Sequence, residues 1–491
     1  MKYEELEEKI KMHNPNADME KIKRAFDFTE AAHQGQLRKS GEPYINHPIA
    51  VAYKLADMDM DSTTIVAGLL HDVPEDTKKT LKDIKNEFGD DVALLVDGIT
   101  KLGQVKYRGM EKYIENLRKM FVAMAADIRV IVIKFADRIH NLETLSFLPP
   151  NKQQRIALES LEIYAPIANR LGMGEIKGAL EDLSFPYLYP KEYDWIQERI
   201  AARRKEKAKS LQLFINDLEE QLKKNNIPYY SIHGRAKHLY SLYHKLLLHN
   251  KDITKIYDLV AIRIIVPTIA HCYECLGILH QYCKPLKGRI KDYIAQPKPN
   301  GYQSLHTTVF TGTGDIVEIQ IRTKEMHYEA EYGIAAHWSY KDKKIDIKDK
   351  IHWVSELSKT MREPMEETEE KFLESLKLDV FQNRIYVFTP KGDVLELPED
   401  ATPVDFAYRI HTDIGHYCAG AKINDQISAL ETKLKSGDVV EIFVDKKRSG
   451  PAEDWLIFVK TSNAKKHIKT FLRKTEKKQL KRLLDYKGPK N

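Results

Sequence analysis

The segment SLHTTVFTGTGDIVEIQIR, residues 304–322, decides the fold of the middle of the chain. Its two apolar-rich runs flank the turn signal Gly-Thr-Gly-Asp at 312–315, and together they predict a β-hairpin. Alternation along the second run places Glu318, Gln320 and Arg322 on one face, opposite valine and isoleucine. A polar strand face is costly to bury unless it lines a site, so this hairpin is expected to carry part of one.

The segments around the hairpin alternate between strand and helix patterns. Short runs with strand character occupy 227–235 and 259–266, and longer amphipathic runs predict helices over 238–248, 270–283 and 323–338. Residues 196–340 are therefore predicted to form a mixed α/β domain. This domain has no Walker motif and no GxGxxG motif, which excludes P-loop and Rossmann nucleotide binding.

The flanking regions differ from this domain in pattern. Residues 1–195 read almost entirely as helices, predicted over 18–32, 47–56, 62–73 and 127–145, with Pro74 preventing simple continuation of the third. Residues 341–379 are charged and predict a helical linker. Short strands with one helix near VDFAYRIHTDI predict a small α+β module over 380–445, and residues 446–491 predict a basic helical tail.

Composition sets the broad class of protein. The 491 residues correspond to about three domains at roughly 150 residues each. The net charge of +6 is unevenly spread: residues 464–490 hold eleven Lys or Arg against two acids, a local charge of +9, and the rest of the chain is close to −3. Four cysteines exclude a disulfide scaffold and fit a reducing cytosol. The charged N-terminus is no signal peptide, and no apolar run approaches the roughly 18 residues of a membrane span. We therefore expect a soluble cytoplasmic protein with no membrane partner.

One group of polar residues predicts a metal site in the helical region. RKSGEPYINHP supplies His47, LLHDVPEDT supplies His71 and Asp72, and KFADRIHN supplies Asp137, all expected near helix ends. Imidazole with carboxylate suits Mn²⁺ or another octahedral cation, which activates water and polarises phosphorus. Glu75 and Asp76 follow by one helical turn, placed to handle a proton or to orient the water. The alternative is a helical domain with buried histidines and solvated acids.

A second group of polar residues predicts nucleotide chemistry in the α/β domain. Lys237, Ser241 and Lys245 are spaced to line one helical face near Arg235, where they can contact a polyphosphate. The loop 284–306 carries five cations against one acid. Its cations include Arg289, Lys291 and Lys298, and Tyr302 adds a flat stacking surface. Asp258 and Glu318 are the expected Mg²⁺ ligands. The alternative is a solvated basic surface.

These motifs together resemble those of the Rel/SpoT homologue family, long bifunctional enzymes that make and destroy the alarmone (p)ppGpp. RKSGEPYINHP, LLHDVPEDT and ADRIHN resemble the hydrolase motifs of the HD superfamily. GRAKHLYS, YDLVAIR, GRIKDYIAQPKPNGYQSLHTTV and VEIQIRTKEMH resemble the synthetase motifs, and residues 384–444 resemble a TGS domain. The resemblance implies an all-α HD-type hydrolase domain, a mixed α/β nucleotidyltransferase-like synthetase domain and a small α+β TGS domain.

The resemblance also implies residue roles. In the hydrolase domain, His47, His71, Asp72 and Asp137 would hold Mn²⁺, Glu75 and Asp76 would assist the water, and Arg38, Lys39, Ser40 and Asn141 would lie near the base and ribose. In the synthetase domain, Arg235 and Arg263 would sandwich adenine, Asp258 and Glu318 would hold Mg²⁺, Tyr302 would stack on guanine, and Glu318 would be the base for the 3′-hydroxyl. The remaining contacts to phosphates or nucleotide would come from Lys237, Ser241, Lys245, Arg289, Lys291, Lys298, Asn300, His306, Gln320 and Arg322.

Two features of the sequence favour a bifunctional member. GRIKD has the basic form associated with such members, and all hydrolase ligands are present. Pro74 stands where many relatives have Val. Long members continue past the TGS domain, whereas this chain stops at Asn491, as in a shortened or naturally short form.

The expected reactions are synthesis of (p)ppGpp from ATP and GDP or GTP, and its hydrolysis. One alternative is an HD phosphohydrolase with a nucleotide-sensing second domain. The other is a non-catalytic regulator that binds RNA in tRNA or the ribosome through the TGS module and the basic tail. The sequence leaves the oligomeric state open.

Overall fold

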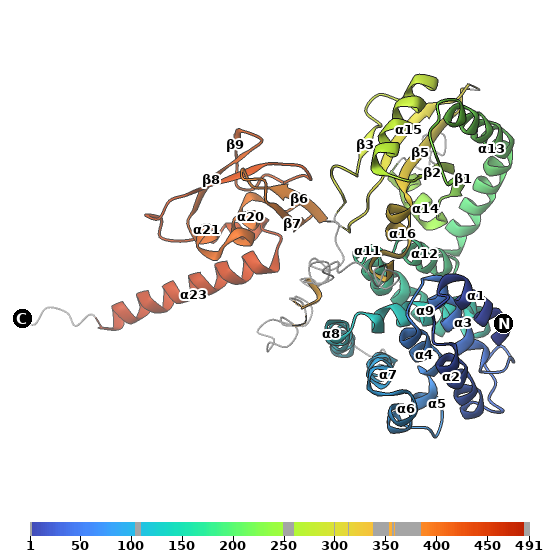
Figure 1. The fold of residues 1–491 in the computed structure, drawn as a ribbon. Helices are drawn as coiled ribbons and strands as arrows, with labels where there is room; N and C mark the ends of the chain where they lie inside the picture. The colour runs from blue at the N-terminus through green and yellow to red at the C-terminus, as the bar shows by residue number, and fades with distance from the viewer. Residues whose placement is uncertain are drawn as a thin grey trace, which may run out of the picture. The chain divides into compact units, whose positions relative to one another are not determined.

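The computed structural model describes residues 2–103, 110–248, 260–298, 300–312, 314–336, 353–355, 358 and 384–485. The chain divides into two compact units, Met1–Pro364 and Met365–Asn491, each considered by itself below (Figure 1).

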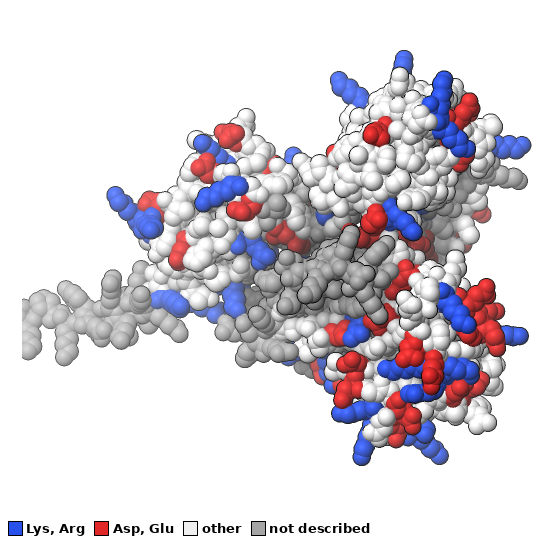
Figure 2. All heavy atoms as spheres, viewed as in Figure 1, with Lys and Arg blue, Asp and Glu red and all other residues white. Residues whose placement is uncertain are grey.

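The start of the first unit is helical, as predicted. Its elements are α1 (Tyr3–His13), α2 (Met19–Ala32), α3 (Asn46–Asp57), α4 (Ser62–Leu70), α5 (Val73–Asp76), α6 (Leu81–Phe88), α7 (Asp90–Gly103), α8 (Met110–Ala126), α9 (Arg129–Glu143), η1 (Leu145–Phe147), α10 (Pro150–Glu159), the π-helical turn η2 (Ser160–Tyr164), α11 (Ala165–Arg170) and α12 (Gly174–Leu188). Figure 2 shows Lys and Arg side chains interleaved with Asp and Glu over these helices on the face in view.

Helix α4 forms the centre of this helical domain and begins at a defined cap. The Asp61 carboxylate accepts a hydrogen bond from the backbone N–H of Thr64 at 2.8 Å, and every residue from Thr64 to Leu70 is buried. The predicted helix 62–73 is therefore too long by three residues. Pro74 lies in the first turn of α5, where a missing N–H is tolerated, so His71 and Asp72 occupy the break between two helices.

The α/β domain is built on a five-stranded sheet in the order β1-β2-β5-β4-β3, with β2 and β5 parallel and the other pairs antiparallel. The strands are β1 (Ser231–Ala236), β2 (Val260–Val266), β3 (Lys291–Asp292), β4 (Leu305–Phe310) and β5 (Ile316–Thr323). The helices are α13 (Pro190–Lys224), α14 (Leu239–Leu248), α15 (Ile269–Tyr282) and α16 (Lys324–Tyr332), followed by the 3₁₀ turn η4 (Gly333–Ala335). The predicted hairpin corresponds to β4 and β5.

The two faces of this sheet have opposite character. Ile262, Ile264, Ile319 and Ile321 pack with apolar residues of α13 and α15 in one buried cluster. The other face is polar, because side chains alternate along each strand. Helix α13 runs without a break through the boundary predicted at residue 195.

The helical and α/β domains meet at two glycines within the first unit. Gly172 and Gly333 have φ of +76° and +53°, the left-handed region that favours glycine. A Cβ atom on Gly333 would lie 2.2 Å from the carbonyl oxygen of Leu171. Any larger residue at position 333 would therefore push the two backbones apart.

The second unit is a small α+β module, as predicted. Its elements are β6 (Arg384–Phe388), β7 (Val394–Pro398), α20 (Pro403–Ile410), α21 (Thr412–His416), β8 (Cys418–Ile423), β9 (Gln426–Ser428), β10 (Val440–Val444), α22 (Trp455–Phe458) and α23 (Ser462–Asp485). The fully buried Asp405 accepts hydrogen bonds from the backbone N–H groups of Thr402, Lys460 and Thr461, which ties the start of α20 to the segment before α23.

Most of the predicted linker 341–379 lies outside the described residues. Trp353 is an exception: its ring is 9% exposed and packs edge-on against Phe121, with the guanidinium of Arg170 4.1 Å from the ring centroid. This part of the segment therefore has core contacts that the prediction of a linker did not include. No helix among the described residues is long and apolar enough to cross a membrane.

Candidate active sites

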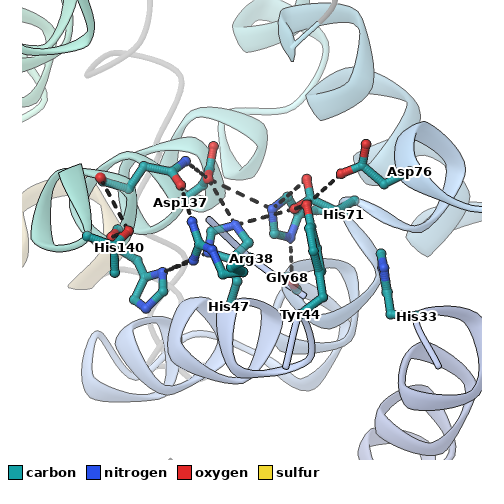
Figure 3. A network of polar contacts seen from close by, with 12 residues as sticks. His33, Arg38, Tyr44, His47, Gly68, His71, Asp76, Asp137 and His140 are labelled. Atoms are coloured by element: carbon teal, nitrogen blue, oxygen red, sulfur yellow. Dashed lines mark hydrogen bonds and ion pairs between the residues drawn. The ribbon is translucent and has the colours of Figure 1, made fainter. Parts of the chain in front are cut away.

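The predicted metal ligands of the helical domain come together in the structure (Figure 3). One donor atom each from His47, His71 and Asp137 lies within 4.8 Å of the others, and all three residues are buried. Asp72 joins them, with Oδ1 3.0 Å from Nε2 of His71 and Oδ2 3.4 Å from Nε2 of His47. Asp137 lies within α9, not near a helix end as predicted. Two helices, α3 and α9, and the break between α4 and α5 therefore supply the set.

The protonation of His71 fits a cation site. Its Nδ1 donates to the carbonyl oxygen of Gly68 at 2.8 Å, so a neutral ring carries its lone pair on Nε2. That Nε2 is buried and makes no hydrogen bond, although Oδ1 of Asp72 lies 3.0 Å from it. Burial disfavours a charged ring, but Asp72 and Asp137 raise the pKa of His71 to about 9. The carboxylates thus favour a positive charge at this point, and a divalent cation can supply it.

Two predicted substrate residues extend this cluster. Arg38 donates from Nη2 to Oδ1 of Asn141 at 2.9 Å, and Asn141 donates from Nδ2 to Oδ1 of Asp137 at 2.5 Å. Ser40 has a buried Oγ without a hydrogen-bond partner, whereas Lys39 is exposed.

The two predicted proton-handling acids lie beside the donor group. The hydroxyl of Tyr44 lies 2.5 Å from Oδ2 of Asp76 and 2.9 Å from Oδ2 of Asp72. Glu75 remains exposed to solvent, yet the protein atoms around its carboxyl desolvate it and raise its pKa to about 7. A carboxyl with such a pKa can exchange a proton at neutral pH.

Sequence reasoning missed three residues of this site. Tyr44 and His140 contact the predicted residues directly, and the buried Lys134 forms an ion pair of 2.7 Å with Asp137. The i,i+3 spacing of Lys134 and Asp137 was a usable signal. The contacts of Tyr44 with Asp72 and of His140 with His47 join segments far apart in the chain. The sequence held no signal for these contacts.

The predicted nucleotide site of the α/β domain lies on the polar face of the sheet. Strand register pairs Arg263 with Gln320 and Gln320 with His306, and paired residues share a face. By the same register and alternation, six predicted residues belong to this face: Arg235, Arg263, His306, Glu318, Gln320 and Arg322.

A chain of hydrogen bonds orders part of this face. Arg322 donates from Nη2 to the hydroxyl oxygen of Tyr302 at 2.9 Å, and that oxygen lies 2.7 Å from Nε2 of His306. Since the guanidinium can only donate, the hydroxyl proton is free to point at Nε2. His306 then carries its proton on Nδ1, which lies 3.3 Å from Oε1 of Glu318. Tyr302 is thereby linked to Glu318.

The charge state of Glu318 separates its two predicted roles. Burial would raise its pKa, but His306, Gln320 and Lys237 lower it to about 2. A carboxylate with so low a pKa binds a cation readily and accepts a proton poorly. In the protein without substrate, Glu318 is therefore better suited to hold a cation than to act as a base.

Several cations surround Tyr302 and the sheet. The ammonium of Lys298 lies 4.9 Å from the Tyr302 ring centroid. Arg289, just before β3, and Lys291, the first residue of β3, are both exposed. Asn300 donates from Nδ2 to the carbonyl oxygen of Asn169 at 3.3 Å, across to the helical domain. Such a surrounding suits a phosphate-bearing ligand.

Other predictions for this site need correction. Lys237 precedes α14, so it does not share one helical face with Ser241 and Lys245 as predicted. Ser241 instead lies 3.5 Å from Oε2 of Glu181 in α12. Asp258 lies outside the described residues.

Arg263 has a partner that sequence reasoning missed. Its Nη2 lies 2.8 Å from Oε1 of Glu331, and its Nη1 lies 3.3 Å from Nδ1 of His327. Both partners project from α16 at i,i+4 spacing. Arg263 is 4% exposed, and burial together with Arg322 lowers its pKa to about 10. The Arg235 side chain is more open, with 29% exposure.

Comparison with known proteins gives three domain matches in order. A model of the HD domain matches residues 25–174, one described as a region found in RelA / SpoT proteins matches 234–345, and a TGS domain model matches 385–444. An HD domain implies use of a divalent metal, in agreement with the His/Asp group above.

Three relatives are similar to nearly the whole of this chain. A GTP pyrophosphokinase of Myxococcus xanthus is 46% identical over 477 residues, 96% of this chain and 62% of that protein. A guanosine-3′,5′-bis(diphosphate) 3′-pyrophosphohydrolase of Aquifex aeolicus is 46% identical over 474 residues, 96% of this chain and 67% of that protein. The bifunctional (p)ppGpp synthase/hydrolase SpoT of Escherichia coli is 45% identical over 476 residues, 96% of this chain and 67% of that protein. The chain thus spans only part of the length of these relatives.

Proposed function

The chain belongs to the Rel/SpoT homologue family, and on that premise we propose that it catalyses two opposing reactions. One transfers pyrophosphate from ATP to the 3′-hydroxyl of GDP or GTP and gives (p)ppGpp and AMP. The other hydrolyses (p)ppGpp to GDP or GTP and pyrophosphate. The observation that carries the proposal is that one unit holds both a buried His/Asp donor group and an ordered polar sheet face.

For hydrolysis, we assign the cation to His47, His71, Asp72 and Asp137, and the cation is Mn²⁺. When bound, it would activate water and polarise the 3′-diphosphate. Glu75, with its raised pKa, takes up or releases a proton near neutral pH, and Asp76 orients the water with Tyr44. Arg38, Lys39, Ser40 and Asn141 receive the base and ribose.

For synthesis, Glu318 and Asp258 hold Mg²⁺, and Glu318 serves as the base for the 3′-hydroxyl once bound nucleotide changes its surroundings. Arg235 and Arg263 hold the adenine of ATP, and Tyr302 stacks on the guanine of the acceptor. The cations and polar groups around them bind phosphates: Lys237, Ser241, Lys245, Arg289, Lys291, Lys298, Asn300, His306, Gln320 and Arg322.

We place these reactions in the cytoplasm, and the four buried free thiols support a reducing compartment. We further propose RNA, in tRNA or the ribosome, as a partner of the second unit. Exposed Lys466, Arg473 and Lys474 on α23 support this, because such side chains bind phosphates.

A single assay tests the proposed activities. The purified chain is incubated with labelled ATP and GDP, and separately with labelled ppGpp, and products are separated by thin-layer chromatography. Formation of ppGpp in the first reaction and of GDP in the second is expected. Hydrolysis without synthesis would favour a phosphohydrolase with a nucleotide-sensing domain, and neither activity would favour a non-catalytic RNA-binding regulator.

Hydrolysis is expected to require Mn²⁺ and to proceed poorly with Mg²⁺ alone. Two of the four proposed donors are imidazole nitrogens, and Mg²⁺ prefers oxygen ligands. The measurement is ppGpp hydrolysis after chelation and readdition of each cation, with residual transition metal determined in every sample. Full activity in Mg²⁺ with no transition metal detected would contradict the Mn²⁺ assignment.

Replacing Tyr302 by Ala is expected to raise the KM for GDP by about 10- to 100-fold, since stacking of a base on an aromatic ring contributes ~1–3 kcal/mol. The KM for ATP should change much less. Tyr302→Phe is the matched control, because it keeps the ring and loses only the hydroxyl contacts with His306 and Arg322. A rise in the KM for ATP with an unchanged KM for GDP would show that the two nucleotides are assigned to the wrong surfaces.

A further inference from the structure

His140 lies between a predicted substrate residue and a proposed metal ligand. Its Nδ1 is 2.8 Å from Nη1 of Arg38 and also 2.8 Å from Nδ1 of His47 (Figure 3). Arg38 comes from the loop after α2, His47 from the first turn of α3, and His140 from the last turns of α9. His140 itself is not in the donor group, because the nitrogen of His47 that faces it is Nδ1 and the donor atoms lie on the Nε2 side.

The protons in this contact can be assigned from the arginine alone. A guanidinium has only N–H donors, so Nδ1 of His140 must accept from Arg38 and carries no proton. Two unprotonated nitrogens 2.8 Å apart would repel each other, so Nδ1 of His47 carries the proton, and it shares the single lone pair of His140 Nδ1 with the N–H of Arg38. A neutral His47 then has its lone pair on Nε2, which lies 3.3 Å from Oδ1 of Asp137 and 3.4 Å from Oδ2 of Asp72.

We propose that His140 is a positioning residue of the hydrolase site, which fixes His47 in the tautomer whose Nε2 can bind a divalent cation. The inference rests on the proposed function, which supplies the cation. Histidines that bind metals commonly have their other ring nitrogen held by a hydrogen-bond acceptor, and loss of such a partner weakens metal binding or activity by about 10- to 100-fold. Here the acceptor is a second histidine, His140. The hydrogen bond from Arg38 requires its Nδ1 to be unprotonated, and so makes it an acceptor for His47.

Arg38 also acts on Asp137, through Asn141, by the same logic. It donates to the amide oxygen of Asn141, which turns the Asn141 NH₂ group toward Asp137. One guanidinium therefore orients a nitrogen donor through His140 and an oxygen donor through Asn141. A substrate that contacts Arg38 would be linked to the cation by both routes.

The test measures binding of Mn²⁺ alone to the full chain after metal removal, by isothermal titration. His140→Phe keeps a ring but has no acceptor, and it should weaken Mn²⁺ binding by about 10- to 100-fold. His140→Asn places an amide oxygen where Nδ1 was and should restore most of the affinity. His33→Phe is the matched control: His33 is 3% exposed and stacked on Tyr44, but the contacts found for it among the described residues do not include His47. It should leave the affinity unchanged.

A second measurement needs no substitution. Nitrogen-15 spectra of the histidine-labelled wild-type chain should show His47 protonated on Nδ1 and His140 on Nε2. Either a His140→Phe variant with wild-type Mn²⁺ affinity or a His140 protonated on Nδ1 would overturn the inference. Failure of the proposed function looks different: the wild-type chain would bind Mn²⁺ with the expected tautomers and yet leave ppGpp intact.

Discussion

Replacing Asp72 by Ala is expected to lower ppGpp hydrolysis more than about 100-fold, because even residues outside the ligand set commonly contribute 10- to 100-fold. The Asp72 carboxylate contacts both imidazoles of the donor group and receives the Tyr44 hydroxyl. Its loss removes a cation donor and leaves Tyr44 without one of its two acceptors. Hydrolysis and synthesis rates of the same preparation are the measurement.

The matched control for this change is Asp91→Ala, which removes an exposed carboxylate in the first turn of α7. It should leave both activities unchanged. Asp72→Ala should continue to make ppGpp, which would accumulate in the assay because it is no longer destroyed. Normal hydrolysis by a folded Asp72→Ala protein would remove Asp72 from the site.

Local periodicity explains why much of the polar sheet face could be predicted. Alternation along residues 316–323 is a property of a single strand, so the shared face of Glu318, Gln320 and Arg322 followed from sequence alone. The pairing of Gln320 with Arg263 and His306 depends on which strands become neighbours, and no local pattern encodes that. The error at Lys237 has a similar origin, because helical spacing predicts a shared face but not the residue at which α14 begins.

The His/Asp group of the helical domain shows the same limit more clearly. Its ligands belong to short motifs that resemble a known family, and the structure brings them together as expected. His140 directly precedes Asn141 but was not predicted. Its role depends on contacts with Arg38 and His47, which lie 102 and 93 residues away in the sequence. Lys134 lies in a mostly apolar stretch, and its pairing with Asp137 was not predicted although the i,i+3 spacing allows it. The contacts that determine which ring nitrogen carries a proton join residues far apart in the sequence. They form only when the helices pack, so a local sequence pattern does not predict them.

Replacing Glu318 by Gln is expected to lower ppGpp synthesis by about 10²–10⁴-fold, the range typical for loss of a general base, with loss of a Mg²⁺ ligand adding to it. Gln is nearly isosteric and keeps an oxygen for the hydrogen bond that Glu318 accepts from Nε2 of Gln320 at 2.9 Å. The fold should therefore be preserved while the charge is lost. Hydrolysis should continue, since Glu318 has no contact with the His/Asp group among the described residues.

Glu325→Gln provides the matched control, because it makes the same chemical change at an exposed position in the first turn of α16. Coupling between the domains can shift the second activity, but typical coupling of ~1–3 kcal/mol changes a rate or affinity only about 5- to 150-fold. The Asp72→Ala variant should therefore lose hydrolysis far more than synthesis. The Glu318→Gln variant should lose synthesis far more than hydrolysis. If a folded Glu318→Gln protein lost hydrolysis as completely as synthesis, two independent sites would be the wrong description, and the glycine crossing at Gly172 and Gly333 would be the first place to look for their connection.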